Sequence, residues 1–292
     1  MSRADPVPDP LAVPSPAQQR LLDAWLPGAE VVHDHSWGLT ERAVLEVAHA
    51  GRRYIVKAGG PRDHHMDREI HAHRNWLEPW TSRGRAPRLV HADAEARLLV
   101  TAHLPGRLVL DSEHVDDPET YRQAGELLSL LHVQGVAVED PDHEARENRR
   151  SLSWLDGPHR IAPAVAARLR SLVASWPTPA TTLVPTHGDW QPRNWLVDDA
   201  GVVSIIDFGR AALRPAMTDL SRLHVQQFRG RPELERAFLD GYGADPREPD
   251  AWHRTLVREA VSTAAWAHQV RDEEFEAQGL RMVDDALATV SG

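Results

Sequence analysis

The sequence contains no cysteine, which excludes disulfide bonds, thiolate metal sites and cysteine catalysis. No apolar run reaches the roughly 18 residues that would span a bilayer. The Pro-rich N-terminus also lacks the apolar segment of a secretory signal. We therefore expect a cytoplasmic protein with no membrane partner. Its 292 residues, 41% apolar and 26% charged, suit one globular domain of two lobes or two small domains.

Lysine is almost as scarce as cysteine. Lys57 is the only lysine, and the other 32 of the 33 basic residues are arginine. It follows the apolar residues Tyr54, Ile55 and Val56 near the end of a predicted strand. A compact ammonium group on a flexible stem does not substitute for a planar guanidinium. The exception therefore indicates a specific role for Lys57.

The stretch from Thr186 to Gly209 reads THGDWQPRNWLVDDAGVVSIIDFG. It places Asp189 and Asn194 five residues apart, and Asp207 follows in an Asp-Phe-Gly turn. Two apolar runs between residues 195 and 206 flank an Asp-Asp-Ala-Gly turn, a pattern that predicts a β-hairpin. Folding this hairpin would bring the three polar side chains to one end.

That trio suits phosphoryl transfer. The reaction needs a carboxylate that orients the attacking hydroxyl, a role predicted for Asp189. It also needs oxygen ligands for Mg²⁺, which we assign to Asn194 and Asp207.

The stretch resembles the catalytic and metal-binding loops of the aminoglycoside phosphotransferase family, relatives of the protein kinases. Protein kinases usually carry Arg after the His of this loop. This chain has Gly188 there, and antibiotic and choline kinases also have glycine. No Ala-Pro-Glu motif follows Asp-Phe-Gly, which argues against a protein kinase. The resemblance extends more weakly from about residue 30 to the C-terminus. It implies an α+β, protein-kinase-like fold of two lobes.

The expected order is a flexible Pro-rich tail (residues 1–17), a nucleotide-binding N-lobe (18–103) and a mainly helical C-lobe (104–292). The N-lobe begins with an amphipathic helix at 18–26. Strands are predicted at 30–33, 43–48, 53–57, 87–90 and 97–101, giving a five-stranded antiparallel sheet. One helix is predicted at 63–83. C-lobe helices are predicted at 119–134, 163–176, 217–228, 232–241, 250–270 and 272–287.

The resemblance implies ATP or GTP as the phosphate donor, with Mg²⁺. Lys57 would hold the nucleotide phosphates, paired with Glu69, with Glu78 as the rival partner. The turn at 34–40 would cover the phosphates with Ser36, Gly38, Thr40 and backbone amides. Thr101 and His103 occupy the positions that would meet the adenine. Further implied roles are loop support by His187, amide acceptance by Asp219 and packing by His132.

The resemblance places the acceptor between the catalytic loop and the C-terminal helices. Candidate contacts there are Trp190, Glu259, Trp266, Asp272, Glu273, Glu274 and Glu276. Carboxylates would pair with ammonium groups and tryptophan faces suit cations, although helix capping and core packing explain these residues equally well. Residues 111–292 hold 30 acidic and 19 basic residues, against 13 and 14 in residues 1–110. This asymmetry fits a cationic acceptor and fits solvated helix faces equally.

The first hypothesis is an O-phosphotransferase that modifies a cationic antibiotic, an aminoglycoside or a basic peptide, and so gives resistance. The second is a kinase for a metabolite such as choline, an amino sugar or a hydroxy amino acid. A third is a pseudokinase that binds nucleotide without turnover. Pseudokinases usually lack one of the Lys, Asp, Asn or Asp residues, and this chain has all four.

The net charge of −10 argues against nucleic acid as a partner. The expected assembly is a monomer or homodimer. Histidines at 33, 35, 64, 65, 71 and 73 match no helical metal-binding pair with a carboxylate, so exposure on a polar face and packing explain them better than a metal does.

Overall fold

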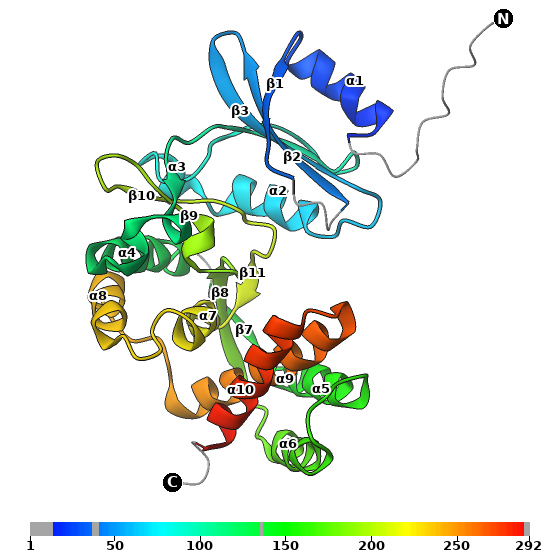
Figure 1. Cartoon of the computed structure of the whole chain (residues 1–292), viewed down its shortest axis with the longest axis vertical. Coiled ribbons are helices and arrows are strands. Elements are labelled where there is room, and N and C mark those ends of the chain that lie inside the picture. The colour runs from blue at the N-terminus through cyan, green and yellow to red at the C-terminus, as the bar shows by residue number, and fades with distance from the viewer. Residues whose placement is uncertain (1–13, 37–40, 135–136, 289–292) are drawn as a thin grey trace, which may run out of the picture.

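The structure is a computed structural model that describes residues 14–36, 41–134 and 137–288. It has two lobes, with the sheet-containing N-lobe above the mainly helical C-lobe in Figure 1. The N-lobe strands are β1 Glu30–Asp34, β2 Arg42–His49, β3 Arg52–Gly59, β4 Leu89–Asp93 and β5 Leu98–Ala102. They form one antiparallel sheet in the order β1-β2-β3-β5-β4. The predicted five-stranded sheet is therefore confirmed.

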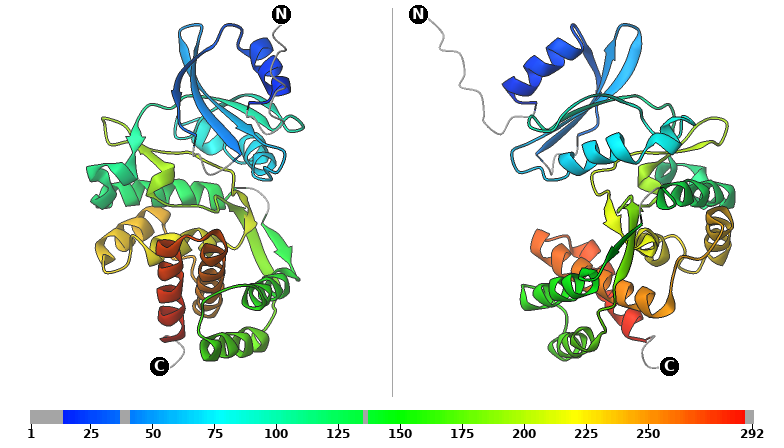
Figure 2. Two further views of the ribbon diagram at one scale, coloured as in Figure 1. Left: turned by 45° about the vertical axis from the view of Figure 1, so that its right-hand side comes forward. Right: turned by 180° about the vertical axis from the view of Figure 1, so that it is seen from behind.

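Helix α1 (Pro16–Trp25) covers the outer face of this sheet (Figure 2). Ser15 begins the helix with a reciprocal capping box to Gln18. The buried Gln18 amide also donates to the carbonyl oxygens of Gly59 and Ala96, at 2.9 and 2.7 Å. The helix therefore starts two residues before the predicted boundary of the tail, and its first turn is bonded to the sheet.

Two helices replace the single helix predicted at 63–83. Helix α2 (Met66–Asn75) ends before a short α3 (Glu78–Thr81) begins. Pro79 explains the break, because proline has no N–H for the helix and its ring clashes with the carbonyl four residues earlier, on Asn75. Helix α2 packs its Met66 and Ile70 against Leu99, on the sheet face that looks toward the C-lobe.

In the described part of the chain, the C-lobe is built from helices with two short three-stranded sheets. Its α-helices are α4 Pro118–His132, α5 His143–Asp156, α6 Pro163–Ser175, α7 Ser221–Val225, α8 Pro232–Tyr242, α9 Pro249–Val270 and α10 Glu273–Ala288. Short 3-10 turns are η1 Val109–Asp111, η2 Glu113–Asp116, η3 Pro192–Asn194 and η4 Ala216–Leu220. The strands β6 Arg107–Leu108, β7 Val138–Asp140, β8 Thr181–Thr186, β9 Trp195–Val197, β10 Val203–Ile205 and β11 Ala212–Arg214 form the sheets β10-β9-β6 and β11-β8-β7. The helix predicted at 217–228 is a 3-10 turn followed by the short α7.

The predicted hairpin is present, because β9 and β10 pair antiparallel. Helix α5 and the sheet β11-β8-β7 were not predicted. The buried positions of α5 include Glu144, Asn148 and Ser151, so the apolar periodicity that indicates a helix is weak there. Arg254 and Arg258 of α9 bind Glu144 at 2.9 and 2.8 Å, which makes this helix face partly an ionic one.

Candidate active site

The N-lobe contributes a lysine that lies between two carboxylates. Lys57 Nζ on β3 lies 2.5 Å from Glu69 Oε1 on α2 and 3.0 Å from Asp207 Oδ1 of the C-lobe. Glu69 is 1% exposed, and Arg42 Nη1 lies 3.7 Å from its other oxygen. Lys57, which the sequence singled out as the only lysine, therefore contacts its expected partner Glu69 in the N-lobe and the Asp-Phe-Gly aspartate, Asp207, in the C-lobe.

This contact sets the charges of Lys57 and Asp207. Burial opposes the charge of Lys57, but Asp207 and Glu69 outweigh it and raise the lysine pKa. Lys57 in turn holds the pKa of the Asp207 carboxyl far below its usual range. Both groups are therefore ionised throughout the physiological range.

Asp207 adopts a left-handed backbone conformation with φ of +66°, which aspartate tolerates better than most residues. The next residue, Phe208, is 1% exposed. Its ring makes edge contacts with His187 at 5.3 Å and with His73 of α2 at 5.2 Å between ring centroids. Phe208 thereby fixes the Asp-Phe-Gly turn between the catalytic loop and α2.

The buried carboxylate of Asp219 holds the first residues of the predicted catalytic loop in place. Asp219 accepts hydrogen bonds from the backbone N–H groups of His187 and Gly188, at 2.8 and 2.6 Å. It also accepts from His132 Nε2 at 3.1 Å, and His132 Nδ1 lies 2.8 Å from the Tyr242 hydroxyl. Asp219 is thus the amide acceptor expected from the sequence.

Gly188 is required by both conformation and space. Its φ is +78°, and a Cβ there would lie 2.3 Å from the carbonyl oxygen of Arg210. A larger residue at this position would push the catalytic loop away from the segment that follows Asp-Phe-Gly.

Ile206 joins the loop that carries Asp189 to the Asp-Phe-Gly turn. Its N–H donates to the Asn194 carbonyl at 3.0 Å. His187 Nδ1 accepts from the Asp189 N–H at 3.2 Å, so Nε2 carries the proton that donates to the Ile206 carbonyl at 3.1 Å. Asp189 and Asn194 are therefore fixed next to the residue that precedes Asp207.

Four side chains surround the Asp189 carboxylate. Gln191 Nε2 and Arg222 Nε lie 2.6 and 2.9 Å from Oδ1, while Arg193 Nη2 and Asn194 Nδ2 lie 2.6 and 3.1 Å from Oδ2. Burial opposes the charge of Asp189, but Arg222 and Arg193 outweigh it and lower the pKa of this carboxyl. The group is ionised at neutral pH, which is the state that accepts a proton.

The residues expected to hold Mg²⁺ fit that ion. Asn194 Nδ2 donates to the carbonyl and carboxylate oxygens of Asp189, which orients the amide and leaves Oδ1 as the ligand atom. The Asp207 side chain is 46% exposed and ionised. The described residues hold no cluster of three His, Asp or Glu able to bind a metal. Mg²⁺ usually takes one or two protein ligands and completes its shell with phosphates and water, and the Asn194 amide oxygen and the Asp207 carboxylate have the chemistry of such ligands.

The other expected nucleotide contacts remain predictions. The Ser36 hydroxyl accepts from the Val44 N–H at 3.0 Å, which ties the start of the phosphate-covering turn to β2. Gly38 and Thr40 lie outside the described residues. Thr101 is 5% exposed near the end of β5, and His103 follows it with its N–H bonded to the Arg53 carbonyl at 3.1 Å.

Trp190 does not line an open surface. It is 1% exposed and packs against Trp80 and Trp195. The expectation that it forms a wall of the acceptor site is therefore wrong, because its position after Asp189 directs the ring into the core.

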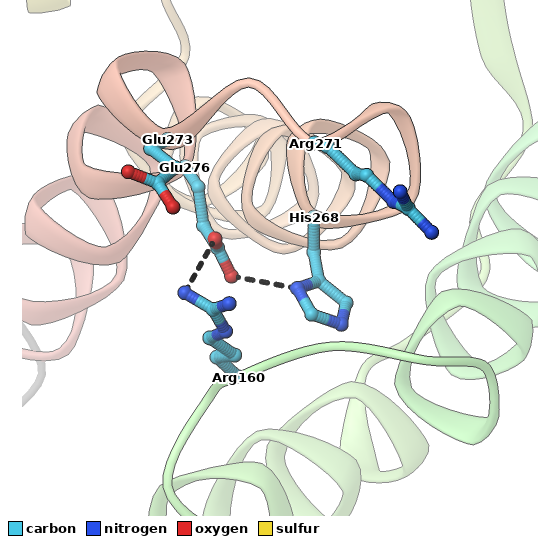
Figure 3. Close-up of a pocket in the computed structure, with 5 residues that line it drawn as sticks. All are labelled: Arg160, His268, Arg271, Glu273 and Glu276. Carbon is cyan, nitrogen blue, oxygen red and sulfur yellow. Dashed lines mark ion pairs between the residues drawn. The ribbon is translucent and has the colours of Figure 1, made fainter.

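Three of the remaining acceptor candidates line two separate cavities. Glu259 of α9 lines a narrow groove together with Arg222 and Phe275, and Arg222 also binds Asp189. Glu273 and Glu276 instead line a separate cavity of about 360 Å³ with Arg160, His268 and Arg271 (Figure 3). There Glu276 is 4% exposed and lies 3.4 Å from Arg160 and 3.0 Å from His268.

Three more candidates are exposed near the connection between α9 and α10. Trp266 is 43% exposed and makes an edge contact with Phe275. Asp272 accepts from the Phe275 N–H at 3.0 Å, as a helix cap does. Glu274 lies in the first turn of α10. These contacts do not join the three residues to Asp189.

The sequence analysis did not predict three arginines of the site: Arg42, Arg193 and Arg222. Arg193 could have been noticed, because it lies inside the catalytic loop one residue before Asn194. Arg42 and Arg222 carry no such signal, since 32 arginines are spread along the chain and only the fold brings these two to the site.

The fold and site define a kinase-like phosphotransferase. The chain belongs to the phosphotransferase enzyme family (APH), whose sequence pattern matches residues 32–256. No curated protein sequence matches the chain. Among the described residues, no helix has both the length and the apolarity to cross a bilayer.

Solved structures with the same fold include three phosphotransferases. Choline kinase LicA from Streptococcus pneumoniae is 17% identical, with a TM-score of 0.68 over 93% of this chain and 97% of the other. Aminoglycoside phosphotransferase APH(4)-Ia is 13% identical, with a TM-score of 0.69 over 94% and 99%. Macrolide 2'-phosphotransferase MphH from Brachybacterium faecium is 18% identical, with a TM-score of 0.60 over 91% and 97%. The protein-kinase-like, two-lobed fold is therefore confirmed.

Proposed function

We propose that the protein transfers the γ-phosphate of ATP or GTP to a hydroxyl group of a small molecule, with Mg²⁺. One observation carries this proposal. Lys57, Glu69 and Asp207 meet across the lobes, and the backbone of Ile206 fixes Asp189 and Asn194 beside them. A thermostable mutant of APH(4)-Ia has been crystallised with ADP and hygromycin B, which supports nucleotide use.

Each group then has a defined task. Lys57, held by Glu69, binds nucleotide phosphates, and Asn194 Oδ1 with the Asp207 carboxylate would hold the metal. When bound, Mg²⁺ neutralises charge that develops on the phosphate oxygens. Asp189 orients the acceptor hydroxyl and takes its proton. The remaining rate enhancement comes from positioning and from charge stabilisation.

Asp189→Asn tests the proposal. The amide keeps the shape but cannot accept the proton, so we expect turnover to fall by about 10³-fold. The measurement is acceptor-dependent ADP formation, with mass spectrometry of the acceptor to detect the added phosphate. Wild-type turnover that persists in this variant would contradict the role of Asp189. Nucleotide binding by the wild type without turnover of any acceptor would favour the pseudokinase hypothesis.

The acceptor class has two candidates. A cationic antibiotic is supported by Glu259 and by the exposed acidic residues at the start of α10, and a resistance role would follow from it. A metabolite kinase is favoured by a specific observation, because Arg193 and Arg222 both bind Asp189 and would repel a cation. Growth of an expressing host on aminoglycosides and basic peptides separates the two candidates, since resistance to none of them favours the metabolite.

A further inference from the structure

The oxygens of the proposed base are already occupied. An ionised carboxylate offers about four acceptor positions, and Asp189 receives Gln191, Arg193, Asn194 and Arg222. An acceptor hydroxyl must therefore displace one of these groups. Gln191 and Asn194 are 6% and 4% exposed and lie within the same tight loop. The side chains of Arg193 and Arg222 are longer and 38% and 23% exposed, so they are the groups that move.

The small free volume beside Arg222 also indicates that this side chain moves when an acceptor binds. The groove lined by Arg222, Glu259 and Phe275 has a free volume of about 10 Å³, roughly enough for one water molecule. An acceptor that enters from this side must push Arg222 aside. Once separated from Asp189, its guanidinium needs another anion, because leaving a partly buried charge unpaired is costly.

The charges around Arg222 favour an acid group on the acceptor as the anion that pairs with its guanidinium. Arg210 lies within electrostatic range of Asp189, together with Arg222 and Arg193, and Glu259 is a further carboxylate within range of Arg210. These five groups carry one excess positive charge, within a chain whose net charge is −10. An acceptor with an ammonium group next to its hydroxyl would meet repulsion here.

We propose that Arg222 and Arg193 select an acceptor carrying a carboxylate or phosphate group close to the hydroxyl that is phosphorylated. This inference rests on the proposed phosphotransferase activity. The acid group of the acceptor pairs with the guanidinium and replaces Asp189 as its partner. The Asp189 carboxylate then accepts the proton of the acceptor hydroxyl. The acceptor oxygen bonds to the γ-phosphorus, the bond to the β-phosphate oxygen breaks, and the nucleoside diphosphate leaves with that electron pair.

Matched acceptors test this selection. The panel pairs glycerate with glyceramide and glycerol 3-phosphate with glycerol, and adds choline and kanamycin as cations. We expect kcat/KM for one acid to exceed that of its neutral partner by about 100-fold, because a polar site rejects an analogue that leaves it unpaired. The two pairs distinguish a carboxylate from a phosphate. A neutral or cationic acceptor that is used as well as the acids would overturn the proposal.

Arg222→Gln localises the effect, with Arg229→Gln as the matched control because Arg229 pairs with Asp285 on the surface. We expect the KM of the acid acceptor to rise about tenfold or more, its advantage over the neutral partner to shrink, and the KM for ATP to stay within about twofold. The control should behave like the wild type. A fall in kcat with unchanged discrimination would instead mean that Arg222 contacts the transferred phosphate, and would overturn the proposal.

A binding measurement tests the selection even if no panel member is phosphorylated. The probe is inorganic sulfate, added at constant ionic strength to the complex with Mg²⁺ and a non-hydrolysable ATP analogue, with the melting temperature as readout. We expect sulfate to stabilise the wild type and the control, and to stabilise Arg222→Gln much less. Equal stabilisation of all three, or none in the wild type, would contradict the proposal. Failure of the wild type to bind the ATP analogue would instead contradict the phosphotransferase function.

Discussion

Single residues at this site have roles that depend on their exact chemistry, and Lys57 is the clearest example. Its ammonium lies 2.5 and 3.0 Å from two carboxylates, and its side chain is only 14% exposed. A guanidinium is wider and planar, so it cannot occupy the same place without displacing Glu69 or Asp207.

We therefore expect Lys57→Arg to lower kcat/KM for the nucleotide by about 100-fold, a cost of roughly 2.7 kcal/mol. Steady-state kinetics with varied ATP measures this. The matched control is the reverse exchange, Arg52→Lys, at an exposed position on the same strand, which should stay within about twofold of the wild type. Equal activity of Lys57→Arg and the control would show that the position needs only a positive charge.

His73 predicts how stability depends on pH. Burial, together with Lys57, lowers its pKa from 6.5 to about 3. Below pH 6.5 the unfolded chain takes up a proton that the folded chain refuses, so the free energy of unfolding falls as the pH drops from 6.5 toward 3.

At pH 5 this cost is about 2 kcal/mol. Urea unfolding of the wild type and His73→Gln at pH 7 and pH 5 measures the difference. The variant should lose less stability between the two pH values by about this amount. Identical losses in both proteins would mean that His73 titrates normally in the fold.

Among the elements, the α4–α8 pair connects packing with the catalytic loop. Helix α4 carries His132 and α8 carries Tyr242, and both belong to the hydrogen-bonded chain that reaches Asp219 and His187. The helices approach closely through two glycines. A Cβ on Gly125 would lie 2.0 Å from the Phe238 carbonyl oxygen, and one on Gly241 would lie 1.9 Å from that of Arg122.

Gly125→Ala should therefore push the helices apart and destabilise the protein by about 3 kcal/mol. Gly157→Ala is the control, because the nearest atoms to a Cβ there lie at 3.6 Å, and it should change stability by no more than about 0.5 kcal/mol. Urea unfolding measures both. A loss in Gly125→Ala as small as that of the control would show that the two helices separate without cost.

Secondary structure was predicted well wherever the local pattern was strong. The N-lobe strands and the hairpin β9–β10 have apolar runs bounded by turn residues, and they formed as expected. The break between α2 and α3 was missed although Pro79 marked it. Helix α5 gave little signal because its buried side is polar and pairs with Arg254 and Arg258, residues more than 100 positions away in the chain.

In the whole molecule, the two lobes meet at the polar and charged groups on which the proposed chemistry depends. Lys57 of β3 and Glu69 of α2 belong to the N-lobe, while Asp189, Asn194 and Asp207 belong to the C-lobe. Asp189, Asn194 and Asp207 could be predicted because they lie in one recognisable stretch, and Lys57 because it is the only lysine. Glu69 was one of two candidates, and the fold brings it to Lys57. Of the arginines that bind Asp189, Arg193 could have been noticed in the loop. Arg222 could not, because it reaches Asp189 from α7 and only the tertiary fold sets its position. The division of the chain at residues 103 and 104 stays a prediction.

The central claim is that the lobes together bind a nucleotide through Mg²⁺, and calorimetric titration with Mg²⁺ and a non-hydrolysable ATP analogue tests it most directly. The wild type should bind the analogue, and Asp189→Asn should bind it about as well. Asp207→Asn should bind it about tenfold more weakly or worse, because the Asp207 carboxylate is both the expected metal ligand and the partner of Lys57, and the variant removes its charge. A wild type that does not bind the analogue, or an Asp207→Asn variant that binds it equally well, would contradict the account.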